Sequence, residues 1–114
     1  MLRSCLFGLA LLLLASPAMA QQMAPSSSSE PASTKAYRDA AMTMGHDMAI
    51  TYSGDADKDF VADMVPHHQG AIDMAKVELQ YGKDPALRKL AHDVVAAQQK
   101  EIAFMKSWQA KHVK

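Results

Sequence analysis

Two imidazoles and two thioethers fall within about three helical turns near the middle of the chain. They belong to Met64, His67, His68 and Met74. Thioether sulfur favours copper in its reduced state, and imidazole nitrogen binds copper in either oxidation state. Neither ligand type forms disulfides, so both remain available in an oxidising compartment. The single cysteine, Cys5, lies near the start of the chain. The segment therefore predicts a metal-binding protein that binds copper as Cu(I), with Cu(II) and Ag(I) as alternatives.

The first twenty residues have the pattern of a secretory signal peptide. Arg3 precedes an apolar run over residues 6–15, and Ala18-Met19-Ala20 has the small residues of a cleavage site. The run is too short to anchor the chain in a bilayer, which takes about 20 apolar residues. Cys5 lies before the run and would leave with the peptide. We therefore expect residues 1–20 to be a signal peptide, and the mature protein to be periplasmic or secreted with no membrane attachment.

The segment that follows, residues 21–34, is rich in Ser, Pro and Ala. It has too few apolar groups to offset the entropy of ordering, so we expect a disordered linker. Lys and Arg total 12 in the whole chain, and Asp and Glu also total 12, which gives a formal net charge of zero. Nucleic-acid binding requires a basic patch, so this composition argues against a nucleic-acid partner.

Helix signals dominate residues 35–111, which we expect to form the folded domain. The first predicted helix covers residues 35–52 and is capped by Ser33 or Thr34. The second is capped by Asp57 or Asp59 and ends before Gly82. The third runs from Asp84-Pro85 to about Ala110. No run alternates with period two, so strands are not expected. Short connections between long helices predict an all-α, antiparallel bundle of three helices. Because the domain is small, pairing into a homodimer would add stability.

In the first predicted helix, two methionines share a stripe with aromatic residues at helical spacing. Met44 and Met48 lie on this stripe with Tyr37, and we expect them to face inward, either as copper ligands or as residues that fill gaps in the core. Met42 and His46 lie nearly opposite. They could form an external metal site or an interface, but scattered surface exposure is the favoured explanation.

In the second predicted helix, His68 falls at the centre of an apolar stripe that includes Phe60, Met64 and Ile72, while His67 lies about 90° away around the helix. A buried histidine can be a purely structural, hydrogen-bonded residue. Here the neighbouring His67 and the two methionines favour a ligand role. Pro66 removes a backbone donor and should kink the helix where these side chains converge.

In the third predicted helix, an apolar stripe that includes Leu90, Phe104 and Met105 has Gln98 and Glu101 at its middle. A carboxylate on such a stripe needs a partner, since an unpaired buried charge is costly. One reading is a metal site in which Glu101 orients His68 and Met105 donates its sulfur. The other is a structural hydrogen bond from Glu101 to a histidine or a glutamine without any metal.

The region from Asp59 to Trp108 closely resembles the family called domain of unknown function 305. The matching residues are Phe60, Met64-Val65-Pro66-His67-His68, Ala71-Ile72-Asp73-Met74-Ala75, Gly82-Lys83-Asp84-Pro85, Leu90-Ala91, Ala97-Gln98, Glu101-Ile102, Met105 and Trp108. The resemblance implies a secreted or periplasmic domain with a ferritin-like helical bundle. It also implies a link to copper or silver binding and resistance in some members, with Met64, His67, His68, Met74, Glu101 and Met105 as the candidate metal-site residues here.

A ferritin-like bundle raises the question of di-iron catalysis, which requires a Glu-x-x-His pair on each of two helices. This chain has Met64-x-x-His67 instead, and thioether sulfur is a poor ligand for ferric iron, so we do not expect an enzyme. The leading hypothesis is a copper-binding protein for buffering, resistance or delivery, which would pass the ion to a copper-handling protein partner. The alternatives are a metal-free helical interaction domain with a polar core and, third, a copper-dependent redox enzyme.

Overall fold

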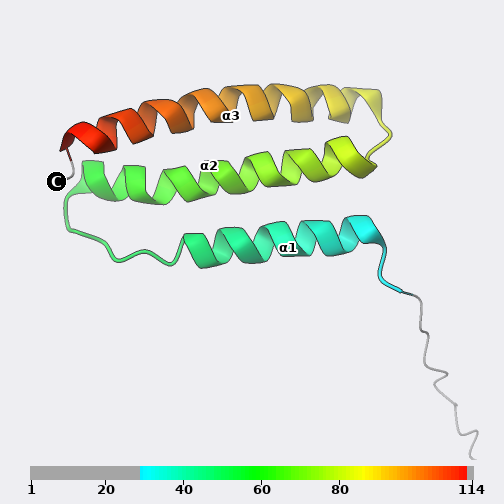
Figure 1. Cartoon of the computed structure of the whole chain (residues 1–114), viewed down its shortest axis with the longest axis horizontal. Helices are drawn as coiled ribbons and strands as arrows, with labels where there is room; N and C mark the ends of the chain where they lie inside the picture. The colour runs from blue at the N-terminus through cyan, green and yellow to red at the C-terminus, as the bar shows by residue number, and fades with distance from the viewer. Residues whose placement is uncertain (1–28, 113–114) are drawn as a thin grey trace, which may run out of the picture.

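The computed structural model describes residues 29–112, and these residues form three α-helices (Figure 1). They are α1, Ala32–Asp47; α2, Ala56–Tyr81; and α3, Pro85–His112. The secondary structure of this range is entirely helical, which confirms the predicted all-α class with three helices. The chain runs from right to left along α1 and α3 in Figure 1 and from left to right along α2. The predicted signal peptide and most of the predicted linker lie outside the described residues.

Helix α1 lies further towards the N-terminus than predicted, at both of its ends. It begins at Ala32, directly after Pro31, and neither Ser33 nor Thr34 caps it with a side-chain hydrogen bond. The last residues of the predicted linker are therefore helical. The helix ends at Asp47 rather than at residue 52, because Tyr52 donates a hydrogen bond of 2.7 Å to Asp63 of α2 and draws the chain out along that helix.

The connection from α1 to α2 is tied down by two aspartates. Asp55 caps α2, since its carboxylate accepts hydrogen bonds from the backbone N–H groups of residues 57 and 58; the predicted caps Asp57 and Asp59 were therefore wrong. Asp59 instead accepts hydrogen bonds from Ser53 N at 2.7 Å, Ser53 Oγ at 2.8 Å and Gly54 N at 3.0 Å. These bonds lower the pKa of Asp59, with the backbone N–H of Ser53 the largest cause. They also hold Gly54 at a φ of 87°.

The turn from α2 to α3 matches the sequence signals. Helix α2 ends at Tyr81 and α3 begins at Pro85, where Asp84 accepts hydrogen bonds of 2.9 Å from the backbone N–H groups of residues 86 and 87. Arg88 reaches back and donates to the carbonyl oxygens of Leu79 at 2.7 Å and Gly82 at 3.0 Å. These contacts satisfy carbonyl groups that the end of α2 leaves free.

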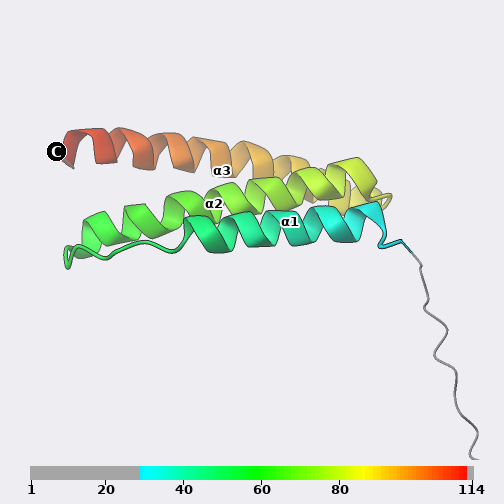
Figure 2. The same cartoon turned by 60° about the horizontal axis from the view of Figure 1, so that its bottom comes forward.

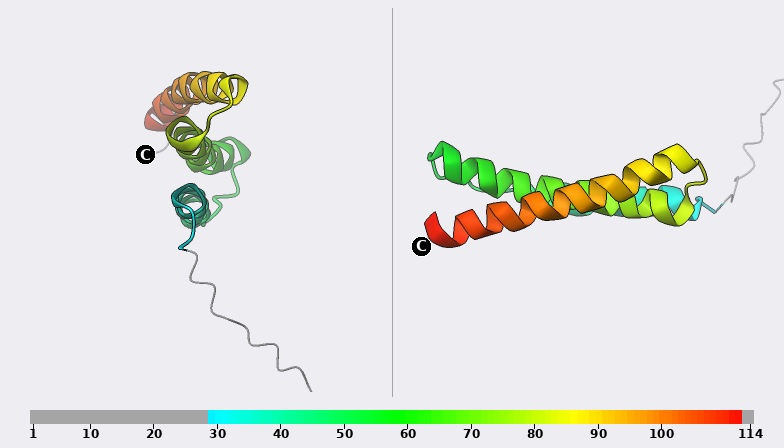
Figure 3. Two further views of the ribbon diagram at one scale, coloured as in Figure 1. Left: turned by 90° about the vertical axis from the view of Figure 1, so that its right-hand side faces the viewer. Right: turned by 90° about the horizontal axis from the view of Figure 1, so that it is seen from above.

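The three helices form a single layer with α2 in the middle. In the described part of the chain α2 contacts both other helices, whereas α1 and α3 do not contact each other. The end-on view in Figure 3 and the turned view in Figure 2 show this order. Helix α1 approaches α2 closely at Gly70, where an added Cβ would lie 2.9 Å from Met44 Cβ. The three helices therefore form an open bundle in which α2 has a neighbour on each side.

The core lies between α2 and α3. It contains the buried residues Val61, Ile72, Ile102 and Met105, with Met64, Val65, Val95 and Trp108 partly buried against them. Several residues expected on inward stripes are exposed instead: Phe60 by 60%, Leu90 by 57% and Phe104 by 73%. The stripes are wider than the strip that one neighbouring helix can cover, so part of each stripe faces solvent.

Helix α2 continues through Pro66 without interruption, so the predicted kink there stays a prediction. Within residues 29–112, no helix combines the length and the apolar character that crossing a membrane requires.

Candidate functional site

The candidate site is centred on a contact between α2 and α3. His68 is buried, with 7% of its surface exposed, and its Nε2 lies 2.6 Å from Glu101 Oε2. An ionised carboxylate only accepts hydrogen bonds, so the imidazole N–H donates. The side chain of Glu101 is 60% exposed, and it therefore reaches His68 from the edge of the layer rather than from within the core. This is the His68–Glu101 contact that the two stripes predicted.

This hydrogen bond selects the tautomer of a neutral His68 ring. In a neutral imidazole with its proton on Nε2, Nδ1 carries a lone pair and no proton. His68 Nδ1 is buried and has no hydrogen-bond partner among the described residues, and the same holds for Gln98 Oε1, one turn before Glu101 on α3. Burying a polar atom without a partner costs about 1–3 kcal/mol. Both atoms are electron-pair donors, so a cation could satisfy them.

Two thioethers belong to the same part of the interface. Met64 lies one turn before His68 on α2 and is partly buried against the core cluster that contains Met105. Met105 is 5% exposed and lies one turn after Glu101 on α3. The structure therefore places His68, Glu101, Met64 and Met105 in one region between the two helices. Imidazole nitrogen and thioether sulfur are both ligand types that suit a soft monovalent cation such as Cu(I).

The remaining candidates lie elsewhere. His67 is exposed, and the centre of its ring lies 6.0 Å from that of His68. Met74 lines a groove about two turns further along α2, near Tyr37 of α1. Met44 contacts Gly70 on the side of α2 that faces α1, whereas His68 faces α3.

Met48 follows the end of α1 and is half-buried. Met42 and His46 of α1 are both exposed, Met42 by 67%. The Nδ1 atom of His46 lies 3.0 Å from Oδ1 of Asp47. The structure thus separates the methionines of the α1 region from the His68 region.

Nitrogen and oxygen ligands alone do not form a metal centre in the described part of the chain. No three side chains of His, Cys, Asp or Glu within residues 29–112 are close enough to hold a metal ion.

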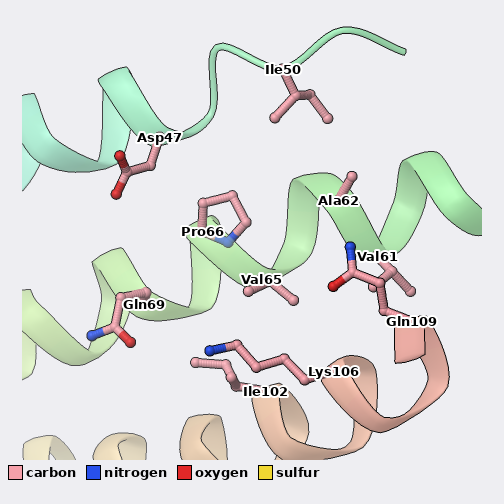
Figure 4. Close-up of a pocket in the computed structure, with 10 residues that line it drawn as sticks. All are labelled: Asp47, Ile50, Val61, Ala62, Val65, Pro66, Gln69, Ile102, Lys106 and Gln109. Atoms are coloured by element: carbon pink, nitrogen blue, oxygen red, sulfur yellow. The ribbon is translucent and has the colours of Figure 1, made fainter. Parts of the chain in front are cut away.

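A pocket of about 400 Å³ lies on another side of α2 (Figure 4). It is lined by Asp47 and Ile50 from the end of α1 and beyond, by Pro66 and Gln69 of α2, and by Lys106 of α3, among others. Neither His67 nor His68 lines it. Its lining shows no convergence of groups for catalysis, and sequence analysis did not identify it because its residues come from three separate segments.

The family described as "Domain of unknown function (DUF305)" matches residues 12–109. The chain belongs to the DUF305 family. The match includes the whole of α1 and α2 and nearly all of α3, so every candidate site residue lies within the DUF305 domain. An uncharacterized protein of Acanthamoeba polyphaga mimivirus is 43% identical over 51 residues. These residues are 45% of this chain and 34% of the viral protein, so the chain matches about a third of that relative's length.

Proposed function

We propose that this DUF305 protein binds Cu(I) as cargo, in the periplasm or outside the cell, and buffers the ion or delivers it to a copper-handling partner. The observation that carries the proposal is the buried Nδ1 of His68, which has no hydrogen-bond partner among the described residues and lies in the same interface as Met64 and Met105. A soft cation bound by Nδ1 would remove the cost of this unpaired nitrogen.

In this proposal each residue has a separate task. His68 Nδ1 and the sulfurs of Met64 and Met105 bind the ion, while Glu101 accepts the Nε2 proton of His68 and holds the ring in the tautomer that leaves Nδ1 free. Met74, Met44 and Met48 are candidates for sites through which the ion passes by ligand exchange, since thioethers are flexible. His67, next to His68 but exposed, is a candidate entry ligand for the ion.

The proposed architecture is a ferritin-like antiparallel bundle in which Pro66 bends α2 beside His68. Pro66 has no backbone N–H to donate to the carbonyl of Ala62, and its ring crowds that carbonyl. A bend at this point would open space next to the imidazole without breaking the helix.

The test is a titration of the purified protein with Cu(I) against a competing chromogenic chelator. We expect the wild-type protein to bind more tightly than micromolar, and His68→Ala to bind at least about tenfold more weakly. Glu101→Gln should weaken binding about 10- to 100-fold, because it removes the charge that orients the ring. His92→Ala, at an exposed histidine of α3, is the matched control and should leave the affinity unchanged.

Wild-type binding weaker than micromolar would refute the proposal, as would equal losses in His68→Ala and His92→Ala. In that case a metal-free interaction domain becomes the better reading. One observation favours that second function: large apolar side chains, including Phe60 and Phe104, are exposed on the domain surface.

A further inference from the structure

One face of the three-helix layer is apolar and open. Two hollows lie on it, one lined by Phe60, Phe104 and Trp108 and the other by Tyr37, Met74 and Leu90. At about 100° per residue, Phe60 and Met74 lie on the opposite side of α2 from Gln69, which lines the pocket of Figure 4. We call the surface that carries the two hollows the apolar face.

The residues of the apolar face repeat with alternating spacings of four and three. On α2 they are Phe60, Met64, His67, Ala71 and Met74. On α3 they are Leu90, Val94, Ala97, Glu101, Phe104 and Trp108. This heptad spacing is typical of a helix surface that packs against further helices. In the described structure nothing covers the apolar face, and its large side chains are therefore exposed, Leu90 by 57% and Phe104 by 73%.

Each of these two stripes has one ionisable residue, and the two residues have opposite character. His67 lies midway between Phe60 and Met74 on α2, one heptad from each. Glu101 lies one heptad from both Val94 and Trp108 on α3. The Oε2 atom of Glu101 contacts His68, so Oε1 is the oxygen that can accept a bond from outside the layer. An acid and a base at matching positions make the face complementary to itself.

We propose that the apolar face binds a second copy of this chain, with His67 of each copy against Glu101 of the other. A two-fold axis that lies in the interface, parallel to the helices and midway between α2 and α3, exchanges these two residues. Such symmetric pairing of one surface with itself is the commonest arrangement in oligomers. The proposal does not depend on metal binding.

The axis also predicts which other residues meet. His68 and Glu101 lie at the same level, because their side chains are in contact. Because α2 and α3 run in opposite directions (Figure 1), each step towards the N-terminus along α2 then matches a step towards the C-terminus along α3 of the second copy. Phe60 meets Trp108, His67 meets Glu101 and Met74 meets Val94, so one heptad of α2 matches one heptad of α3 at all three levels.

The size of the face also fits a dimer. The 26 residues of α2 span about 39 Å, and two packed helices are roughly 19 Å wide, which gives about 750 Å² per copy. A stable protein–protein interface buries about 800 Å² per partner. The result is a bundle with α2 and α3 of both copies at its centre and α1 on the outside.

The test is sedimentation equilibrium of the purified protein without added metal. We expect a dimer at micromolar concentrations, and Phe104→Glu should raise its dissociation constant about 30-fold or more. Met42→Glu is the matched control, since Met42 is 67% exposed on α1 away from the apolar face, and it should change the constant little. His67→Glu sets acid against acid and should also weaken the dimer, whereas His92→Glu, on the polar side of α3, should not.

A wild-type protein that stays monomeric overturns the proposal, and so does a dimer that Phe104→Glu and Met42→Glu weaken equally. A dimer that is sensitive to Phe104→Glu but not to His67→Glu overturns the pairing of His67 with Glu101. Circular dichroism of each variant checks that the helices remain folded, which we expect because the substituted side chains are exposed in one copy.

Discussion

Replacing His68 by leucine should stabilise the metal-free protein. The substitution loses the hydrogen bond to Glu101, which contributes about 1 kcal/mol here because the Glu101 side chain is 60% exposed and regains water. The substitution also removes the unpaired Nδ1, which recovers about 2 kcal/mol of stability, and the added apolar burial contributes about 1 kcal/mol more. A change of shape in a packed site costs about 1 kcal/mol. His68→Leu should therefore raise the free energy of unfolding by about 1 kcal/mol.

The assay is urea unfolding followed by circular dichroism, with a chelator present and at one protein concentration throughout. A gain of about 1 kcal/mol corresponds to a rise of about 4–8 °C in Tm for a domain of this size. Ile72→Ala, one turn further along α2 at a side chain that is 2% exposed, should instead lose about 2–5 kcal/mol and shows that the assay detects packing. If His68→Leu destabilises the protein by 1 kcal/mol or more, Nδ1 is not an unpaired buried atom, and the main support for the copper site is lost.

Two further predictions concern the attachment of α1 and its connection to α2. The pKa of Asp59 is lowered below its usual value of 3.8, so its hydrogen bonds stabilise the fold above that value and are lost as the pH falls through the lowered pKa. Hydrogen exchange at Ser53, corrected for intrinsic rates, should accordingly show constant protection from neutral pH down to about 4 and lose it only below the usual value of 3.8. Constant protection throughout would contradict this. Gly70→Ala should displace Met44 and destabilise the protein by about 1–3 kcal/mol, with the loss of exchange protection concentrated in α1. The control Gly45→Ala adds a Cβ that meets nothing within 4 Å, so it should be neutral or stabilising, and equal effects of the two substitutions would refute the close approach.

The parts of the fold that could be predicted from the sequence depend on local interactions. Asp84 and Pro85 start α3 through contacts within one turn, and their effect needs no knowledge of the rest of the chain. The end of α1 could not be predicted in the same way. It depends on the hydrogen bond from Tyr52 to Asp63, a contact between residues eleven positions apart whose formation requires α2 to be in place.

The candidate site was predictable to a similar extent. Periodicity placed His68 and Glu101 on apolar stripes and gave a histidine, a glutamine or a metal as possible partners of Glu101, so their contact was one of the predicted alternatives. The expected burial of Glu101 was wrong, since its side chain is 60% exposed. The unpaired Nδ1 could not be predicted, since it depends on which ring nitrogen turns towards Glu101. Nor could the exposure of Phe104, because a single stripe does not show which part of it a neighbouring helix covers.

The two proposals share Glu101 and His67, but the atom that each one cannot do without is different, so each can fail without the other. Copper binding requires the Nδ1 of His68, and pairing of two copies requires His67 and the Oε1 of Glu101. His68→Leu should remove the first and leave the second, whereas His67→Glu should weaken the dimer and leave Nδ1 untouched. Glu101→Gln should affect both, because its carboxylate orients one imidazole and accepts from the other. None of these three side chains belongs to the apolar core cluster, so the substitutions should leave the packing of α2 against α3 intact. Loss of both properties in all three variants would instead indicate a general disturbance of that interface.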